Sequence, residues 1–185
     1  MEPDAALAAQ AAAGDREAFG ALVQRHQAAV RRLTRAVTGN VHDADDAAQD
    51  AFLSALDRLE TYDPLRPFGP WLMRIATNAS IDLVRRRAVR RSDALDERAP
   101  ARGPSPASDA EAAEIRQRLG VALAALPERQ RVAVTLFDVE GYSHAEIAAV
   151  LEIPEGTVRS DVFHARRALR VALEPYDPGK RMEER

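Results

Sequence analysis

The chain has 185 residues, 37 of them alanine, with 5% aromatic side chains, no cysteine and a formal net charge of −3. This composition favours closely packed helices over β-sheets, and the lack of cysteine excludes disulfides and thiolate metal sites. No apolar run approaches the roughly 20 residues of a membrane span, and the acidic start is unlike a secretory signal. We therefore expect an all-α protein that makes no membrane contact itself.

The first 60 residues predict three helices. A short alanine-rich helix is expected near residues 4–13. Asp15 caps a second helix, with apolar residues recurring every three or four positions, and Gly39 ends it. Asp43 caps a third helix with one apolar stripe, formed by Ala47, Ala48, Ala51, Phe52, Ala55, Leu56 and Leu59.

A fourth helix follows the loop that contains Pro64 and Pro67. It begins near Phe68, buries Trp71 and Leu72, and continues into five arginines within residues 85–91. Residues 74–102 hold 8 arginines and 4 acids, whereas residues 1–60 hold 6 basic and 10 acidic side chains. The basic part is suited to phosphate contacts, and the acidic part suits a basic protein surface.

Residues 92–109 interrupt the helical pattern with three prolines, a glycine and no aromatic side chain. This composition is typical of a flexible linker. It separates a domain at residues 1–91 from a second domain at 110–185. Each domain is small enough to be marginally stable alone, which favours support by a larger partner.

The second domain opens with a helix near residues 109–125, followed by a helix from Pro127 to Gly141. Ser143 and Glu146 have the spacing of a capping box and start a short helix. Glu152 stands in the next turn, where a left-handed backbone would cost about 1 kcal/mol. A long helix over residues 155–172 turns four apolar side chains inward: Val158, Val162, Ala165 and Leu169.

The short helix, tight turn and long helix are typical of a helix-turn-helix. The long helix exposes polar side chains whose arginines can pair with guanine edges or phosphates. An ordinary helical hairpin with a solvated charged face is the alternative. Because cap, turn and exposed arginines coincide, we interpret this segment as DNA-binding. The exposed set is Arg159, Ser160, Asp161, His164, Arg166 and Arg167.

The acidic segment around Asp43, Asp45, Asp46 and Asp50 allows three interpretations. It is a helix start with a solvated acidic face, a metal site, or a docking face for a basic partner. No histidine or glutamate completes a metal shell, so we expect no metal.

Phe68 and Trp71 lie beside the polar residues Arg74 and Asn78. Aromatic rings next to a basic helix suit single-stranded bases, although burial of Trp71 in the core is the simpler alternative. The four histidines lack partners at catalytic spacing, and no nucleophile or phosphate-loop motif is present. We therefore expect neither an enzyme nor a cofactor.

Taken together, three segments resemble one family. Residues 43–52, D-A-D-D-A-A-Q-D-A-F, resemble the D-x-E-D-x-x-Q-x-x-F signature of the bacterial sigma-70 family, with Asp45 in place of glutamate. Residues 68–86 resemble its DNA-melting and promoter-recognition segment. Residues 126–131, 141–148 and 156–160 resemble its C-terminal helix-turn-helix. The two-domain length resembles the extracytoplasmic-function (group 4) subfamily.

The resemblance implies a sigma factor, which binds core RNA polymerase, directs it to promoters and helps to open the DNA. It assigns the first domain two groups of residues. Docking on the clamp coiled coil of the largest polymerase subunit falls to Asp43, Asp45, Asp46, Gln49 and Phe52. Recognition and melting of the −10 element fall to Phe68, Trp71, Arg74, Asn78, Arg85 and Arg86.

The resemblance also places the second domain at the −35 element of promoter DNA and on the flap of the second-largest subunit. It implies an anti-sigma factor as a further candidate partner and a cytoplasmic location, on the nucleoid when in holoenzyme. The DNA-reading residues would be Thr157, Arg159, Ser160, Phe163, Arg166 and Arg167.

Two residues of the long helix depart from the family pattern. Asp161 and His164 stand where relatives typically carry arginine or another basic residue. Asp161 then accepts from a cytosine, pairs with a nearby arginine such as Arg159, or stays outside the DNA. These three roles remain open at this point.

The main rival interpretation is a stand-alone helix-turn-helix regulator that acts without polymerase. It predicts a ligand-binding or dimerisation domain in front, and the first 91 residues show no such pattern. A helical adaptor that binds only proteins would leave the arginines of the long helix and Asn78 without a role.

Overall fold

The computed structural model describes residues 2–93 and 110–174, and every regular element within those ranges is helical, as expected. The front domain contains α1 (Asp4–Ala12), α2 (Arg16–Thr38), α3 (Val41–Asp57), the 3-10 turn η1 (Leu59–Thr61) and α4 (Phe68–Asp93). The rear domain contains α5 (Ala110–Ala125), α6 (Glu128–Val134), the π turn η2 (Thr135–Val139), α7 (His144–Leu151) and α8 (Glu155–Leu173).

Local sequence signals set most helix ends. The Asp15 side chain accepts hydrogen bonds from the backbone N–H groups of Glu17 and Ala18, at 2.9 and 3.1 Å. Gly39 ends α2 in the left-handed conformation, with φ of 74°. The predicted cap of α3 is wrong, because Asn40 takes that position and its side chain accepts from the Asp43 N–H. Asp43 lies one turn inside the helix.

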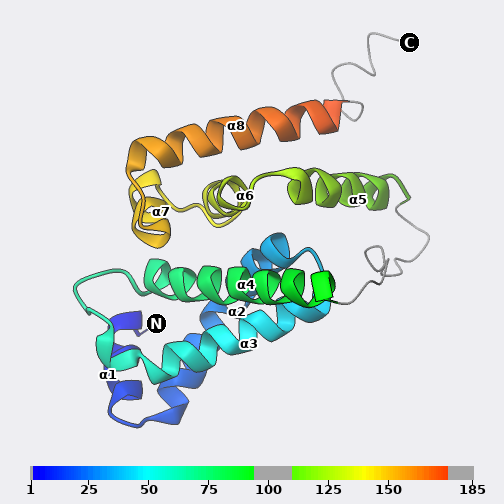
Figure 1. Ribbon diagram of the computed structural model, residues 1–185. Helices are drawn as coiled ribbons and strands as arrows, with labels where there is room; N and C mark the ends of the chain where they lie inside the picture. Colours follow the sequence, from blue (N-terminus) through cyan, green and yellow to red (C-terminus); the bar gives the residue numbers. More distant parts are fainter. Residues whose placement is uncertain (1, 94–109, 175–185) are drawn as a thin grey trace.

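The core of the front domain lies between α2, α3 and α4 (Figure 1). Large aliphatic side chains from α2 and α4, including Leu33 and Leu72, are fully buried. The residues that α3 buries are small, which lets its backbone approach the neighbouring helices closely. Leu56 does not belong to the buried stripe predicted for this helix, since it is 43% exposed.

In the rear domain, α8 packs against α5, α6 and α7. Val158, Val162 and Ala165 are buried as predicted, and Leu169 is half-buried. The helix predicted from Pro127 to Gly141 is interrupted after Val134, where the chain widens into the π turn. Such a turn shifts the helix register by one residue.

The two domains pack against each other, with α7 against α4 (Figure 1). One continuous apolar cluster joins Leu33 and Leu72 of the front domain to Val132 and Ile147 of the rear domain. The predicted linker, residues 92–109, lies outside the described residues except for the last two residues of α4. None of the described helices is long and apolar enough to pass through a lipid bilayer.

Candidate functional site

The acidic segment of α3 divides into one inward and several outward side chains. Asp43 is buried, accepts from the Asn40 side-chain amide at 2.6 Å and forms an ion pair with Arg87 of α4. Asp45 is exposed and pairs with Arg31 of α2 at 3.2 Å. Asp43 therefore fixes α3 against α4, and it is the exposed members of the predicted docking set that can meet a partner: Asp45, Asp46 and Gln49.

Phe52, also predicted to touch polymerase, is half-buried against the front core. The outer face of α3 carries two apolar side chains beside it, Leu53 at 53% and Leu56 at 43% exposed. The sequence pattern wrongly counted Leu56 in the buried stripe, and it left Leu53 without an assignment. An acidic face continued by exposed leucines suits a protein partner better than DNA.

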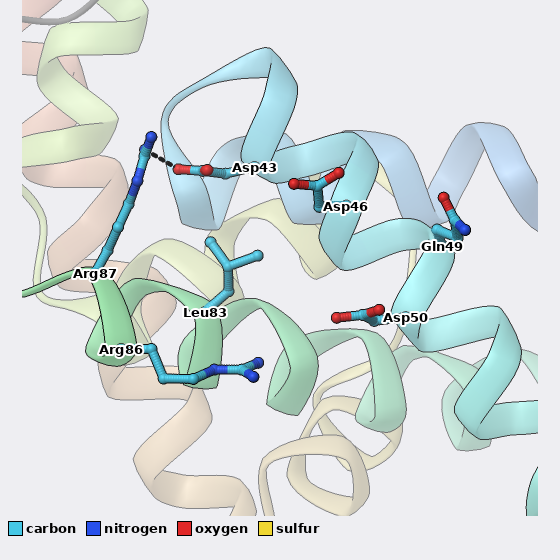
Figure 2. A pocket seen from close by; sticks show the side chains of 7 residues that line it. All are labelled: Asp43, Asp46, Gln49, Asp50, Leu83, Arg86 and Arg87. Atoms are coloured by element: carbon cyan, nitrogen blue, oxygen red, sulfur yellow. Dashed lines mark hydrogen bonds and ion pairs between the residues drawn. The ribbon is translucent and has the colours of Figure 1, made fainter. Parts of the chain in front are cut away.

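A groove between α3 and α4 brings this acidic face next to the arginines of α4 (Figure 2). Its volume is about 400 Å³. The Asp43–Arg87 pair spans the groove, while Asp46 and Asp50 project from α3 and Arg86 from α4. The Arg86 Nε donates to the Asp82 carbonyl of its own helix at 3.2 Å. Two residue groups that the sequence assigned to different tasks thus form one mixed-charge surface.

The aromatic residues before and within α4 form a cluster. Phe68 is buried, with ring centroids of Tyr62, Trp71 and His26 between 5.2 and 5.4 Å away. Its ring faces are therefore covered by protein in this conformation, which leaves neither face open to stack on a base. The Tyr62 hydroxyl donates to the Arg66 carbonyl at 2.6 Å and closes the loop before α4. Trp71 is half-buried in the same cluster.

Three of the polar residues predicted on α4, namely Arg74, Asn78 and Arg85, lie along the side that meets the rear domain. Arg74 pairs with Glu152 at 3.0 Å, and Arg85 approaches Glu128 to 3.9 Å. Asn78 is exposed and lines a small pocket between the domains. Within the described residues, no cluster of histidine and acidic side chains is arranged to hold a metal ion.

The helix-turn-helix has the geometry its sequence predicts. Ser143 and Glu146 form both bonds of the capping box at the start of α7. Glu152 ends α7 with φ of 55° and ψ of 43°, which is the left-handed conformation that favours glycine. Pro154 precedes the first residue of α8.

The predicted reading face of α8 is exposed, apart from Thr157, which is half-buried. Arg159 pairs with Glu155 at 2.6 Å, and Phe163 is 62% exposed. Arg166 forms a forked ion pair with Asp138 of η2 and stacks over the Phe137 ring at 4.8 Å. The hydrogen bond to Asp138 raises the pKa of Arg166. Ser160 and Arg167 complete the exposed set.

Asp161, left with three possible roles by the sequence, is a structural residue. Its side chain is 5% exposed and accepts from the Nε and Nη2 of Arg129 on α6, at 2.6 and 3.3 Å. The hydrogen bond raises the pKa of Arg129. Asp161 thus pairs with an arginine, but with Arg129 of α6 rather than Arg159, and its side chain is buried between the two helices.

Comparison with known proteins gives two family matches in sequence order. Residues 22–90 match the family model for sigma-70 region 2, and residues 116–169 match that for sigma-70 region 4. These ranges cover most of the helices of the front and the rear domain.

Curated relatives agree with the family models. The ECF RNA polymerase sigma factor SigE of Mycolicibacterium smegmatis is 40% identical over 86% of this chain, which spans 64% of SigE. The ECF RNA polymerase sigma factor SigM of Mycobacterium tuberculosis is 39% identical, over 90% of this chain and 82% of SigM.

One solved relative has the same architecture. The structure of CnrH in complex with the cytosolic domain of CnrY is 33% identical, with a TM-score of 0.72 over 94% of this chain and 99% of CnrH. A sigma factor of that name from Cupriavidus metallidurans is also 35% identical to this chain over 182 residues.

Proposed function

Because the chain belongs to the extracytoplasmic-function group of the sigma-70 family of RNA polymerase sigma factors, we propose that it joins core polymerase through α3 and reads promoters through α4 and α8. The observation that best supports this division is the separation of an exposed acidic face on α3 from an exposed arginine face on α8. The curated relatives are named RNA polymerase sigma factors, which favours a regulatory protein rather than an enzyme.

The domain boundaries belong to the proposal. Residues 1–91 form the region 2-like domain, 92–109 the linker and 110–185 the region 4-like domain. The matched ranges, 22–90 and 116–169, fall inside the two outer parts and support the division.

Docking on the clamp coiled coil of the largest polymerase subunit is proposed for Asp45, Asp46 and Gln49, which are exposed on one helix. Asp43 and Phe52 contribute by holding that helix in place, since both are at least half-buried. The rear domain would contact the flap of the second-largest subunit.

Reading of the −10 element is proposed for Asn78, with Arg74, Arg85 and Arg86 holding the backbone. An exposed amide can accept from and donate to a base edge, and guanidinium groups pair with phosphates. Phe68 and Trp71 support the loop of residues 60–67 through their mutual packing.

Reading of the −35 element is proposed for the exposed face of α8. Arg159 contacts a guanine or phosphate, and Arg166, held by Asp138, contacts the backbone. The remaining contacts fall to Thr157, Ser160, Phe163 and Arg167.

Two further proposals concern partners and location. The solved relative CnrH is held by the cytosolic domain of CnrY, which supports an anti-sigma partner for this chain as well. A role with polymerase and promoter DNA places the chain in the cytoplasm, at the nucleoid when in holoenzyme.

Co-purification with core RNA polymerase tests the proposed function. We expect the tagged chain to retain all core subunits in near-stoichiometric amount. Specific protection of promoter DNA by the chain alone, without polymerase binding, would instead support a stand-alone helix-turn-helix regulator.

A further inference from the structure

The proposed function so far assigns no role to the N-terminal helix α1. This helix lies before residue 22, where the match to sigma-70 region 2 begins. Three of its side chains, Leu7, Ala8 and Ala11, are buried in the front core, so α1 packs closely against α2. The first residue of α1, Asp4, is charged, and its carboxylate also contacts α2.

Both oxygens of the Asp4 carboxylate are bound by neighbouring residues of α2. Arg25 donates to Oδ1, and the Nε2 of His26 donates to Oδ2 at 2.9 Å. The side chains of Asp4 and His26 are 24% and 14% exposed, so their contact is largely shielded from water. Because an ionised carboxylate only accepts hydrogen bonds, Asp4 fixes both the tautomer and the orientation of the imidazole ring.

The oriented ring of His26 lies against the aromatic cluster before α4. The ring centroids of His26 and Phe68 are 5.4 Å apart, and Phe68 meets the Tyr62 ring edge-on at 5.2 Å. The Tyr62 hydroxyl in turn donates to the Arg66 carbonyl at 2.6 Å, which closes the loop before α4. Burial raises the pKa of Tyr62, and the negative charge of Asp4 adds to this rise. A line of direct contacts therefore joins Asp4 to the loop.

We propose that Asp4 is a positioning residue for recognition of the −10 element, because it fixes His26 against Phe68 and so holds the loop before α4 in the conformation that meets DNA. Asp4 acts through the aromatic cluster and not by its own contact with DNA. The proposal rests on the proposed function of α4, and it gives α1 a part in promoter selectivity. It predicts that loss of the Asp4 carboxylate lowers selectivity at the −10 element and leaves selectivity at the −35 element, which belongs to α8, intact.

The first experiment measures base preference with the full chain and core polymerase. Promoter libraries randomised across the −10 or the −35 element are transcribed with the wild-type chain and with Asp4→Ala. Loss of the contact with His26 should lower discrimination among bases at the −10 element about two- to tenfold, the range that one hydrogen bond contributes. Discrimination at the −35 element should stay at the wild-type level. A residue that only stabilises the fold would instead lower the yield from all promoters together.

A second variant tests whether Asp4 acts through His26. His26→Phe keeps a ring against Phe68 but has no N–H to donate, so it should reproduce the defect of Asp4→Ala. The double variant should be no worse than either single variant, because both substitutions break the same contact. The matched control is Glu2→Gln, which removes a carboxylate that accepts from Gln10 of α1. This control should leave the preferences at both elements unchanged.

Trp71 provides a measurement that needs neither DNA nor polymerase. It is the single tryptophan of the chain, and its ring centroid lies 5.3 Å from that of Phe68 and 5.4 Å from that of Tyr62. Its fluorescence therefore reports on the aromatic cluster in the full-length protein. Quenching by acrylamide should increase in Asp4→Ala, because a loosened cluster opens to the quencher more often, and it should stay at the wild-type level in Glu2→Gln.

Several results would each overturn the proposal in a protein whose circular dichroism shows native helicity. They are unchanged −10 discrimination or unchanged Trp71 quenching in Asp4→Ala, an equal loss at both promoter elements, additive defects in the double variant, or the same defect in Glu2→Gln. If Asp4→Ala loses native helicity, His26→Phe gives the same test, because it leaves α1 unchanged. Failure of the proposed function has a different signature: the wild-type chain with core polymerase would show no base preference at either element, and the proposal would fall with it.

Discussion

Buried ion pairs decide which charged residues remain available for partners. Asp43 and Asp161 both belong to segments that the sequence marks as functional, yet each is buried against an arginine of another helix. Separating a buried carboxylate from its arginine costs free energy, and a buried carboxylate is not accessible to a new partner. The exposed charges of these segments are therefore Asp45 and Asp46 on α3 and the arginines on the outer face of α8.

Asp161→Ala should alter stability without altering base preference. Removing the carboxylate leaves Arg129 half-exposed and solvated, so we expect a loss of about 1 kcal/mol in unfolding free energy. Arg159→Ala should leave stability unchanged and cost about 1–3 kcal/mol at one base pair if its contact is bidentate. Transcription from a promoter library randomised across the −35 element measures the base preference of each of the two variants. A shifted preference in Asp161→Ala would show that this residue reads DNA after all.

Asn78→Ala should impair promoter opening without weakening polymerase binding. The amide is exposed and at the proposed base-reading position, so its loss removes about 1–3 kcal/mol of base contact. The Asn78→Ala variant is compared with the wild-type chain in two measurements. One is its affinity for polymerase, and the other is transcription from a duplex promoter and from a pre-melted bubble of the same sequence. If the variant is as active as the wild type on both templates, Asn78 does not read a base.

At the scale of helices, signals within a few residues predict the structure well. The Asp15 cap, the Gly39 stop and the capping box of Ser143 and Glu146 are all observed, because each depends on neighbours in sequence. The arginine partners of Asp43 and Asp161 were not predictable, since they lie 44 and 32 residues away. Which face of a helix is buried also depends on distant elements, as the exposed Leu56 shows.

Charge reversal at Asp45 and Asp46 should weaken docking on polymerase without unfolding the front domain. Both side chains are exposed near the start of α3, where loss of an acid costs only about 0.3–1 kcal/mol in helix stability. Binding of the double lysine variant to core polymerase is measured with circular dichroism as the folding control. Retained affinity at native helicity would remove α3 from the docking surface. Asp43→Asn provides a comparison, because it should act on stability through Arg87 instead.

At the scale of the whole molecule, the packing of the two domains is the feature that sequence patterns did not reveal. Composition and motifs predicted two helical domains joined by a linker. A linker does not determine which faces of the two domains pack together. The interface depends on single residues of both domains, as Gly69 shows. A Cβ there would lie 2.6 Å from the Tyr142 hydroxyl, so the front of α4 approaches the rear domain as closely as a glycine allows.

Tyr142 should also make the free energy of unfolding depend on pH. Burial raises the pKa of Tyr142 to about 12, above the value near 10 of an unfolded chain. Stability from the neutral hydroxyl is therefore complete below pH about 10 and is lost as the pH rises through about 12. Denaturant unfolding from pH 9 to 12 should show this loss, and Tyr142→Phe should reduce it. An identical pH profile in the phenylalanine variant would exclude Tyr142 as the cause.

Run-off transcription with purified core polymerase tests the central claim most directly. Core enzyme alone starts without promoter specificity, and addition of this chain should produce transcripts from a defined start site on a subset of templates. Those transcripts should depend on sequences about two helical turns apart, because α4 and α8 read separate elements. Binding of the chain to core polymerase with no specific start on a genomic template library would contradict the account.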